Sequence, residues 1–245
     1  MSTFKECSFF EKGNDGVIFY PSIFLKKRDE NLFISKISTA ENIKNEKYIY
    51  DSLPEKFNNV FYEKKCYKYS FKEKKVHLDD QIKEWLNVKK KQNPEVKYDS
   101  IISIKFFEGH NLNKIITNLV ETSFDDIRKL LKRLRCLLNF VNSLNNKYYI
   151  FHRDISDRNI LFNINTYDIR LIDFARSRKY DTPFFPINLP INDNNALINV
   201  INNVLDFAKK KFECDLFKQI KTEQDLCKRL IKLKIYKNNN NNKRF

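Results

Sequence analysis

The chain has 245 residues, of which 42% are hydrophobic and 31% charged, so it is long and apolar enough to bury one sizeable core. This composition excludes a disulfide-held miniprotein and argues against wholesale disorder. Lysine and arginine total 46 against 31 aspartate and glutamate residues, a formal net charge of +15, which suits an anionic partner but is explained as readily by solubility.

The first part of the chain has the pattern of three β-strands. Strand-like residues flank residues 13–16, which contain two of the three glycines, Gly13 and Gly16, so two strands joined by a tight turn are predicted. Residues 31–37 are also β-prone, and Lys36 is the single lysine among them. We therefore expect a third strand that carries one cation.

From Thr39 onward the apolar residues follow a helical spacing. Thr39 is a suitable N-cap for a helix. The residues that follow at steps of three and four, and therefore share one face, are Ile43, Glu46, Tyr50 and Leu53. The pattern predicts a helix with Glu46 as the one carboxylate on an otherwise apolar stripe.

A lysine-rich segment follows, from residue 62 to residue 97. It contains 11 lysines against 6 acidic residues, and only a short helix over residues 80–90, around the single tryptophan Trp85, can be assigned in it. After it, the apolar run over residues 101–107, ended by a Glu-Gly pair, predicts a buried strand.

The second part of the chain is helical. Residues 123–126 resemble a capping box, and apolar residues from Ile127 to Leu144 form a continuous stripe, so a long helix is expected here. Two further helices are predicted over residues 193–212 and 222–236, with a loop between them. A strand-rich part before a helix-rich part indicates an α+β fold.

These elements suggest two lobes and a polar end. Residues 1–105 form a β-rich N-terminal lobe with the lysine-rich insert, residues 106–236 a helical C-terminal lobe, and residues 237–245 a frayed tail. The end of the chain is basic, with 12 basic against 4 acidic residues from residue 209 to 245. Nucleic acid, an anionic membrane surface and an acidic protein remain open as partners of this charge, although no sequence-specific nucleic-acid binding is expected.

The cysteine pattern and the lengths of the apolar runs indicate the cellular compartment. The five cysteines are widely spaced without a C-x-x-C pair, so neither a disulfide framework nor a structural zinc site is indicated. The sequence contains no apolar run of the ~18 residues that a membrane span needs, and it begins without the pattern of a signal peptide. We expect a soluble monomer in the cytoplasm, or in a host's cytoplasm for a viral or effector protein.

Three oxygen-bearing side chains lie next to a predicted β-hairpin. Two strand-like runs, residues 160–162 and 169–172, flank a turn, so Asp154 and Asn159 precede the hairpin and Asp173 follows it. Because a hairpin brings its ends together, the three side chains are expected to converge. Their oxygens suit Mg²⁺, which binds carboxylates and amides together with the phosphates of a substrate.

The same residues resemble the motifs of the protein-kinase-like superfamily. The catalytic loop of that superfamily, H-R-D-x-x-x-x-N, is matched by His152, Arg153, Asp154 and Asn159. The stretch that begins at Asp173, D-F-A, resembles its metal motif D-F-G.

Four upstream features resemble the superfamily in its usual order. The stretch from Gly13 to Ile18 is similar to the second half of the glycine-rich phosphate loop, Lys36 to the lysine of the third strand, and Glu46 to its helix partner. Glu108 and the residues after it resemble the segment that follows the hinge. The resemblance covers residues 10 to about 180 and implies a bilobal protein-kinase-like fold with a reduced helical C-terminal lobe.

The resemblance implies a role for each site residue. Asp154 would accept or orient the proton of the attacking hydroxyl, and Asn159 and Asp173 would hold Mg²⁺, or alternatively Mn²⁺, on the phosphates of ATP. Lys36, held by Glu46, would neutralise these phosphates, and Arg158 could add positive charge. The residues that the resemblance assigns to nucleotide binding are Gly13, Asn14, Asp15, Gly16, Ile18, Lys36, Ile104, Phe106 and Phe107.

The chain also departs from the superfamily pattern. Ser156 stands where Ser/Thr kinases usually carry a lysine, and this resembles the RIO kinases, which also have a serine at that place. Ala175 replaces the glycine of the D-F-G motif, so the local turn should differ. No A-P-E motif follows Arg176, and only about 70 residues remain, as in minimal kinases of the RIO and Bud32 type and in some viral or effector kinases. With so short a loop, we expect no phosphorylation switch at Arg153.

The sequence favours a minimal Ser/Thr protein kinase that phosphorylates a protein substrate, which could be acidic. A small-molecule kinase of the aminoglycoside or sugar-lipid type remains open, favoured by the short C-terminal lobe and opposed by Arg153. A pseudokinase that binds a partner through the lysine-rich insert is the third alternative. His152 is expected to be a hydrogen-bonded structural residue and not a general base. The alternative interpretation of Lys36 is a lysine on an edge strand with its ammonium in solvent, and that of Glu46 is an ordinary acid on a helix surface.

Overall fold

The computed structural model describes residues 8–12, 16–20, 33–62, 66–70, 80–181 and 192–241. Its chain divides into two compact units. The first unit comprises Met1–Asn59, Glu63–Phe107 and Phe174–Arg176. The second comprises Val60–Tyr62, Glu108–Asp173 and Ser177–Phe245. Both units combine antiparallel strands with helices, which confirms the α+β class expected from the sequence.

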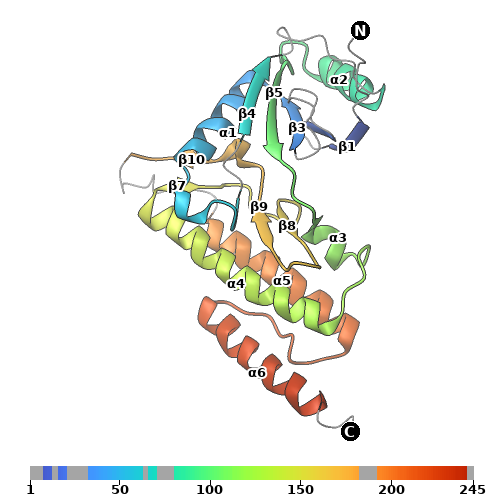
Figure 1. Ribbon diagram of the computed structural model, residues 1–245, viewed down its shortest axis with the longest axis vertical. Helices are drawn as coiled ribbons and strands as arrows, with labels where there is room; N and C mark the ends of the chain where they lie inside the picture. The colour runs from blue at the N-terminus through green and yellow to red at the C-terminus, as the bar shows by residue number, and fades with distance from the viewer. Residues whose placement is uncertain are drawn as a thin grey trace. The chain divides into compact units, whose positions relative to one another are not determined.

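Five antiparallel strands form the sheet of the first unit, in the spatial order β1-β2-β3-β5-β4 (Figure 1). They are β1 (Ser8–Lys12), β2 (Val17–Tyr20), β3 (Phe33–Ser38), β4 (Cys66–Ser70) and β5 (Ser100–Lys105). The sequence predicted all of these strands except β4. That strand lies in the lysine-rich segment, where the frequent charges obscure the alternation of Tyr67, Lys68 and Tyr69.

The helix α2 (Asp80–Gln92) covers one face of this sheet. Ile82 and Trp85 pack against apolar side chains of three strands, and all of them are buried. The strand residues of this core are Val17, Phe19, Ile37 and Ile101. Val17 lies opposite Ile37, and Ile37 opposite Ile101, so these three point to the same face. The lysine-rich segment therefore contributes both a strand and a covering helix to the first unit.

The helix α1 (Ala40–Ser52) begins as expected after Thr39, whose side chain accepts a hydrogen bond from the amide of Asn42. A one-turn helix, η2 (Glu55–Phe57), follows it. Another, η4 (Phe174–Arg176), packs against α1 from far along the chain. The rings of Tyr50 and Phe174 lie 5.2 Å apart, and Asn45 donates a hydrogen bond of 2.7 Å to the carbonyl of Ala175.

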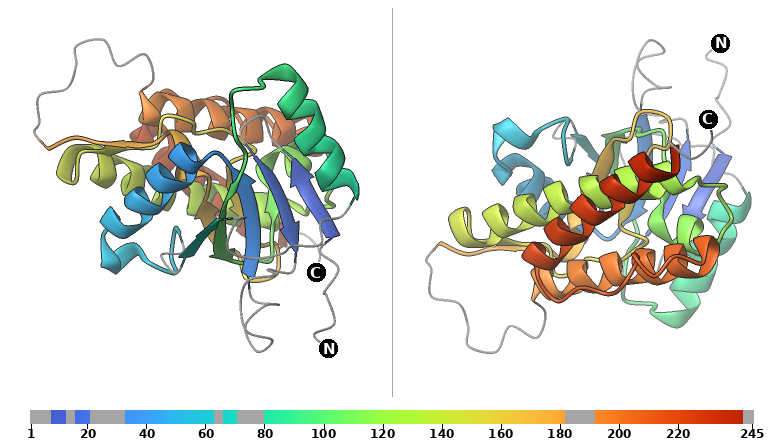
Figure 2. Two further views of the ribbon diagram at one scale, coloured as in Figure 1. Left: turned by 90° about the horizontal axis from the view of Figure 1, so that it is seen from above. Right: turned by 90° about the horizontal axis from the view of Figure 1, so that it is seen from below.

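Helices dominate the second unit. They are α3 (Leu112–Ile116), α4 (Phe124–Lys147), α5 (Asp193–Phe212) and α6 (Glu223–Asn241). Both α5 and α6 pack against α4, and Figure 2 shows α4 alongside them. The α4 stripe predicted from the sequence is buried from Ile127 to Leu144, and the capping box at Ser123 is present.

Two small antiparallel sheets complete the second unit. One contains β6 (His110–Asn111), β8 (Ile160–Phe162) and β9 (Ile169–Leu171). The other contains β7 (Ile150–Phe151) and β10 (Arg178–Lys179). The strands β8 and β9 form the hairpin that the sequence predicted, so the residues before β8 and after β9 lie at the same end.

Two element boundaries differ from the sequence prediction. The strand predicted over residues 101–107 ends at Lys105, and Phe106 and Phe107 lie outside it. The helix predicted to end at residue 236 continues as α6 to Asn241, and the rest of the predicted tail lies outside the described residues. No proline or glycine interrupts this stretch, so the helix propagates from the turns before it. In the described part of the chain, no helix is long and apolar enough to cross a membrane.

Candidate active site

Strand register places three of the predicted nucleotide-binding side chains, Ile18, Lys36 and Ile104, on one face of the sheet in the first unit. Ile18 lies opposite Lys36, and Lys36 lies opposite Ile102. Directly paired residues of antiparallel strands point to the same face, and so do residues two apart along a strand. Ile104, two residues after Ile102, therefore shares the face of Ile18 and Lys36, opposite to the face that α2 covers.

Gly16 lies too close to β3 for any side chain. A Cβ atom there would lie 2.7 Å from the carbonyl oxygen of Ile37 and 3.1 Å from Cε of Lys36. The glycine is therefore required by close packing, since none of the described glycines has a positive φ. The other predicted loop residues, Gly13, Asn14 and Asp15, lie outside the described residues.

Lys36 and Glu46 form a buried ion pair. Lys36 Nζ lies 3.1 Å from Glu46 Oε2, and only 8% and 1% of the two side chains is exposed. Glu46 reaches Lys36 from the buried stripe of α1, which explains a carboxylate at that position. Because a flexible ammonium needs a fixed counter-charge to keep one orientation, this pair holds the Lys36 ammonium in place.

The predicted nucleotide-binding residues Ile104, Phe106 and Phe107 lie on either side of the end of β5. Ile104 lies opposite Ile34 and Cys66, within the ladder. Phe106 lies beyond the strand, and its ring centroid is 5.2 Å from that of Tyr20 on β2. Phe107, also half-buried, is the last residue of this stretch of the first unit.

In the second unit, Asp154 and Asn159 lie in direct contact. Asn159 Nδ2 donates hydrogen bonds of 2.9 Å to the carbonyl of Asp154 and 3.2 Å to its carboxylate. The carbonyl of Asn159 accepts a hydrogen bond from the amide of Ile172, which directly precedes Asp173. With Nδ2 used in this way, Asn159 has its amide oxygen as the potential metal ligand.

Two residues of the predicted motifs have strained backbones. The φ angle of Arg153 is 66° and that of Asp173 is 63°, in the left-handed region that residues with a Cβ rarely adopt. Such strain costs about 1–3 kcal/mol per residue and persists only where the surroundings fix the conformation, most often at functional sites. Ala175, which replaces the glycine of the D-F-G motif, lies in η4 without a positive φ.

His152 is a buried structural residue, as the sequence analysis expected. Nδ1 accepts the amide hydrogen of Asp154 at 3.3 Å, so Nε2 carries the proton and donates to the carbonyl of Ile172 at 2.9 Å. Burial is the largest effect on the pKa of His152 and lowers it, although Asp193, Asp173 and Asp154 act in the opposite direction. The neutral ring links the loop that contains Asp154 to the residue before Asp173.

Sequence reasoning missed Asp193 and Ser177. The buried carboxylate of Asp193 accepts the amides of His152 at 2.7 Å and of Arg153 at 2.9 Å. Ser177 Oγ donates to the carbonyl of His152 at 3.2 Å. In the sequence, Asp193 looks like an ordinary acid in the first turn of α5, so no local signal revealed its long-range role.

The second unit thus offers two carboxylates and an amide for a cation. No group of three or more His, Cys, Asp or Glu side chains that could bind a metal occurs among the described residues. Asn159 contacts Asp154, and Asp173 follows the other strand of the same hairpin. Oxygens of carboxylates and amides are the ligand type that suits a hard cation such as Mg²⁺, which binds a few protein oxygens and substrate phosphates.

Arg158 lies on the exposed side of the same loop. In the part of the chain that the structure describes, its guanidinium forms no ion pair. No protein-family model matches the chain, and no curated protein matches its sequence.

Proposed function

We propose that the protein is an ATP-dependent phosphotransferase with a bilobal protein-kinase-like fold. In this proposal it is a minimal Ser/Thr protein kinase of the cytoplasm, which transfers the γ-phosphate to a hydroxyl of a protein substrate. The observation that carries the proposal is the contact of Asn159 with Asp154 at the end of a hairpin whose other strand leads to Asp173.

The residues of the second unit would perform the transfer. The Asp154 carboxylate accepts or orients the proton of the attacking hydroxyl. Asn159 and Asp173 would hold Mg²⁺ or Mn²⁺, and the bound metal would neutralise charge on the phosphates. The contact between Asn159 and Asp154 fixes the base relative to the metal ligands. Arg158 supplies a positive charge that stabilises the negative charge on the phosphate during its transfer.

The residues of the first unit would bind the nucleotide. The Lys36 ammonium contacts the phosphates, and its buried pair with Glu46 keeps it in one orientation. Ile18 and Ile104, on the same face as Lys36, supply an apolar surface for the base. Gly16 allows β2 and β3 to approach each other closely beside Lys36.

Replacement of the proposed base tests this function. We expect Asp154→Asn to reduce γ-phosphate transfer by about 10²-fold or more, because the amide cannot accept the proton, while ATP binding in a thermal-shift assay is retained. Asp157→Asn is the matched control, since it changes an aspartate of the same loop that has no assigned role. Transfer by Asp154→Asn at the wild-type rate would exclude Asp154 as the base.

The acceptor is tested separately. Purified protein with γ-labelled ATP should label proteins rather than sugars or aminoglycosides. Labelling of a small molecule alone would replace the protein-kinase assignment with a small-molecule kinase. Absence of a Mg²⁺-dependent thermal shift with ATP would favour a nucleotide-independent binding module.

A further inference from the structure

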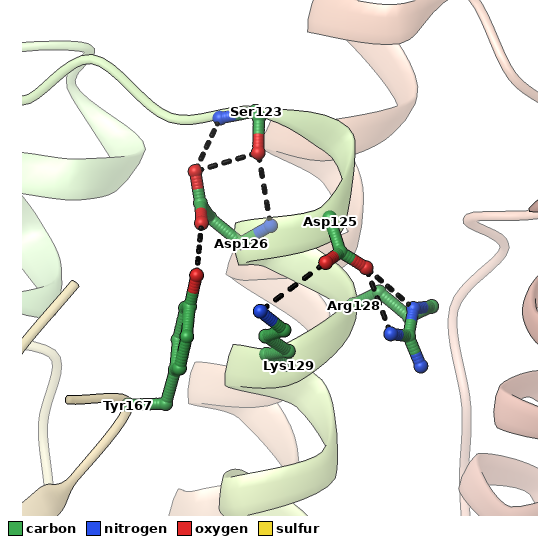
Figure 3. Close-up of polar contacts among 6 residues, drawn as sticks. All are labelled: Ser123, Asp125, Asp126, Arg128, Lys129 and Tyr167. Atoms are coloured by element: carbon green, nitrogen blue, oxygen red, sulfur yellow. Dashed lines mark hydrogen bonds and ion pairs between the residues drawn. The ribbon is translucent and has the colours of Figure 1, made fainter. Parts of the chain in front are cut away.

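The turn between β8 and β9 is attached to α4, at the end of the hairpin away from Asn159 and Asp173. Figure 3 shows Tyr167 of this turn beside the first turns of α4. Tyr167 Oη donates to Asp126 Oδ1 at 3.2 Å, and Lys129 Nζ lies 3.7 Å from the centre of the Tyr167 ring. Arg133 Nε donates to the carbonyl of Tyr167 at 2.8 Å. We call Tyr167, Asp126, Lys129 and Arg133 the Tyr167 clamp.

The α4 side of the clamp is itself held in place. The other carboxylate oxygen of Asp126 accepts hydrogen bonds from the Ser123 amide at 2.8 Å and hydroxyl at 2.6 Å (Figure 3). Burial raises the pKa of Asp126, but the hydrogen bonds from Ser123 and Tyr167 outweigh it, so the pKa lies below its ordinary value. Lys129 is held by Asp125 at 3.3 Å. Tyr167 therefore meets an ionised, oriented acceptor.

The turn side of the clamp is rigid as well. Asn163 Oδ1 accepts the amides of Asn165 at 2.8 Å and Thr166 at 3.0 Å. Tyr167 has a φ of 61°, a left-handed conformation that is unfavourable for a bulky residue. An asparagine or glycine would adopt this backbone at lower cost. The ring and the hydroxyl of Tyr167, which bind α4, explain why an aromatic residue occupies this position.

The paired strands transmit this attachment to the other end of the hairpin. The register runs without interruption from Phe162 opposite Ile169 to Ile160 opposite Leu171. One residue further, the amide of Ile172 donates to the carbonyl of Asn159 at 3.0 Å. Because the two strands are paired along their whole length and β8 also pairs with β6, the attachment at the turn is one of the contacts that orient the hairpin end at Asn159 and Asp173.

We propose that Tyr167 is a positioning residue that sets the affinity of the Asn159 and Asp173 end of the hairpin for nucleotide-bound Mg²⁺. This inference rests on the proposed phosphotransferase function. Tyr167 contacts neither nucleotide nor metal in this proposal, and acts only through the orientation of β8 and β9. Its removal should weaken the response to Mg²⁺ more than the stability of the fold.

The test compares Mg²⁺ titrations of γ-phosphate transfer at saturating ATP. Tyr167→Phe removes only the hydroxyl that donates to Asp126. We expect the half-maximal Mg²⁺ concentration to rise about three- to tenfold, less than the about 10- to 100-fold typical of residues that orient metal ligands directly, because Tyr167 acts through the hairpin. The metal-free unfolding temperature should fall by no more than about 4 °C. Tyr98→Phe in the first unit is the matched control and should leave the Mg²⁺ response unchanged.

Arg133→Gln is the second variant, since it breaks the other attachment of the turn, and it should shift the Mg²⁺ response in the same direction. An unchanged half-maximal Mg²⁺ concentration in both variants, with normal transfer by the wild-type protein, would overturn the clamp proposal alone. No phosphate transfer by the wild-type protein would overturn the proposed function and the clamp with it.

Discussion

Arg153 and Asp173 show how single residues are held in unfavourable backbone conformations by their neighbours. The amide of Arg153 is bound by the buried carboxylate of Asp193, and the carbonyl of the residue before Asp173 is bound by His152. These contacts offset strain of about 1–3 kcal/mol per residue. His152 must be neutral to accept the hydrogen bond from the Asp154 amide. Protonation of His152 at low pH would therefore disrupt this arrangement.

We predict that the protein loses stability as the pH falls below about 6.5 because of His152. Its pKa is lowered in the folded state from an ordinary value of 6.5, so the unfolded chain takes up a proton at a pH where the folded chain does not. The sign is therefore a loss of stability with falling pH, by at most about 1.4 kcal/mol per pH unit. Urea unfolding between pH 7.5 and pH 5.5 measures it.

The comparison is between two histidine variants. His152→Gln should be less stable at pH 7.5 but should lose less stability on acidification than the wild-type protein. His110→Gln changes an exposed histidine and should keep the wild-type pH dependence. Equal losses in the His152→Gln and wild-type proteins would contradict the assignment.

Among the elements, α2 shows how a segment with a charged sequence can contribute to a core. Its outward side chains are mostly exposed and include lysines, whereas Ile82 and Trp85 are buried against the sheet. The Trp85 and Tyr98 rings meet edge to face at 5.1 Å. The helix therefore stabilises the face of the sheet opposite to Lys36.

We predict that Ile82→Ala lowers the free energy of unfolding by about 2–5 kcal/mol, because it leaves a cavity between α2 and the strands. Val88→Ala is the matched control on the same helix, since Val88 is 45% exposed, and it should change stability by about 0.5 kcal/mol or less. Both effects are measured by urea denaturation. Equal effects of the two substitutions would mean that α2 does not pack as described.

In the whole molecule, the chain crosses between its two units more often than a simple two-lobe order requires. Phe174–Arg176 belongs to the first unit, although the residues on both sides of it belong to the second. The fully buried Phe174 contacts Tyr50, and the Ala175 carbonyl binds Asn45. The segment that follows Asp173 is thus part of the structure that carries Lys36 and Glu46.

We predict that a fragment of residues 1–107 does not unfold cooperatively by itself. It lacks Phe174, whose removal from a core costs about 3–5 kcal/mol, a large share of the stability of a small domain. The same fragment joined by a Gly/Ser linker to residues 174–181 should regain a cooperative transition in urea, followed by circular dichroism. A sharp transition in the shorter fragment would show that η4 is dispensable.

Local patterns in the sequence were sufficient for the elements with strong periodicity. The α4 stripe, the Ser123 capping box and the β8–β9 hairpin were predicted correctly, because each depends on neighbours within a few residues. The strand β4 and the end of α6 were not, since surrounding charge and low helix propensity outweighed the weak local signals. The proximity of Asp154 and Asn159 also followed from spacing along one loop and hairpin.

Contacts between distant residues lay beyond what any local pattern contains. The sequence named Lys36, Glu46, Asp154, Asn159 and Asp173 as candidates, because side-chain chemistry and motif spacing are written in the chain itself. It offered no sign that Asp193 binds the loop around His152 or that Tyr167 binds Asp126. Those partners are 41 residues apart in each case, and packing of separate elements alone brings them within hydrogen-bonding distance.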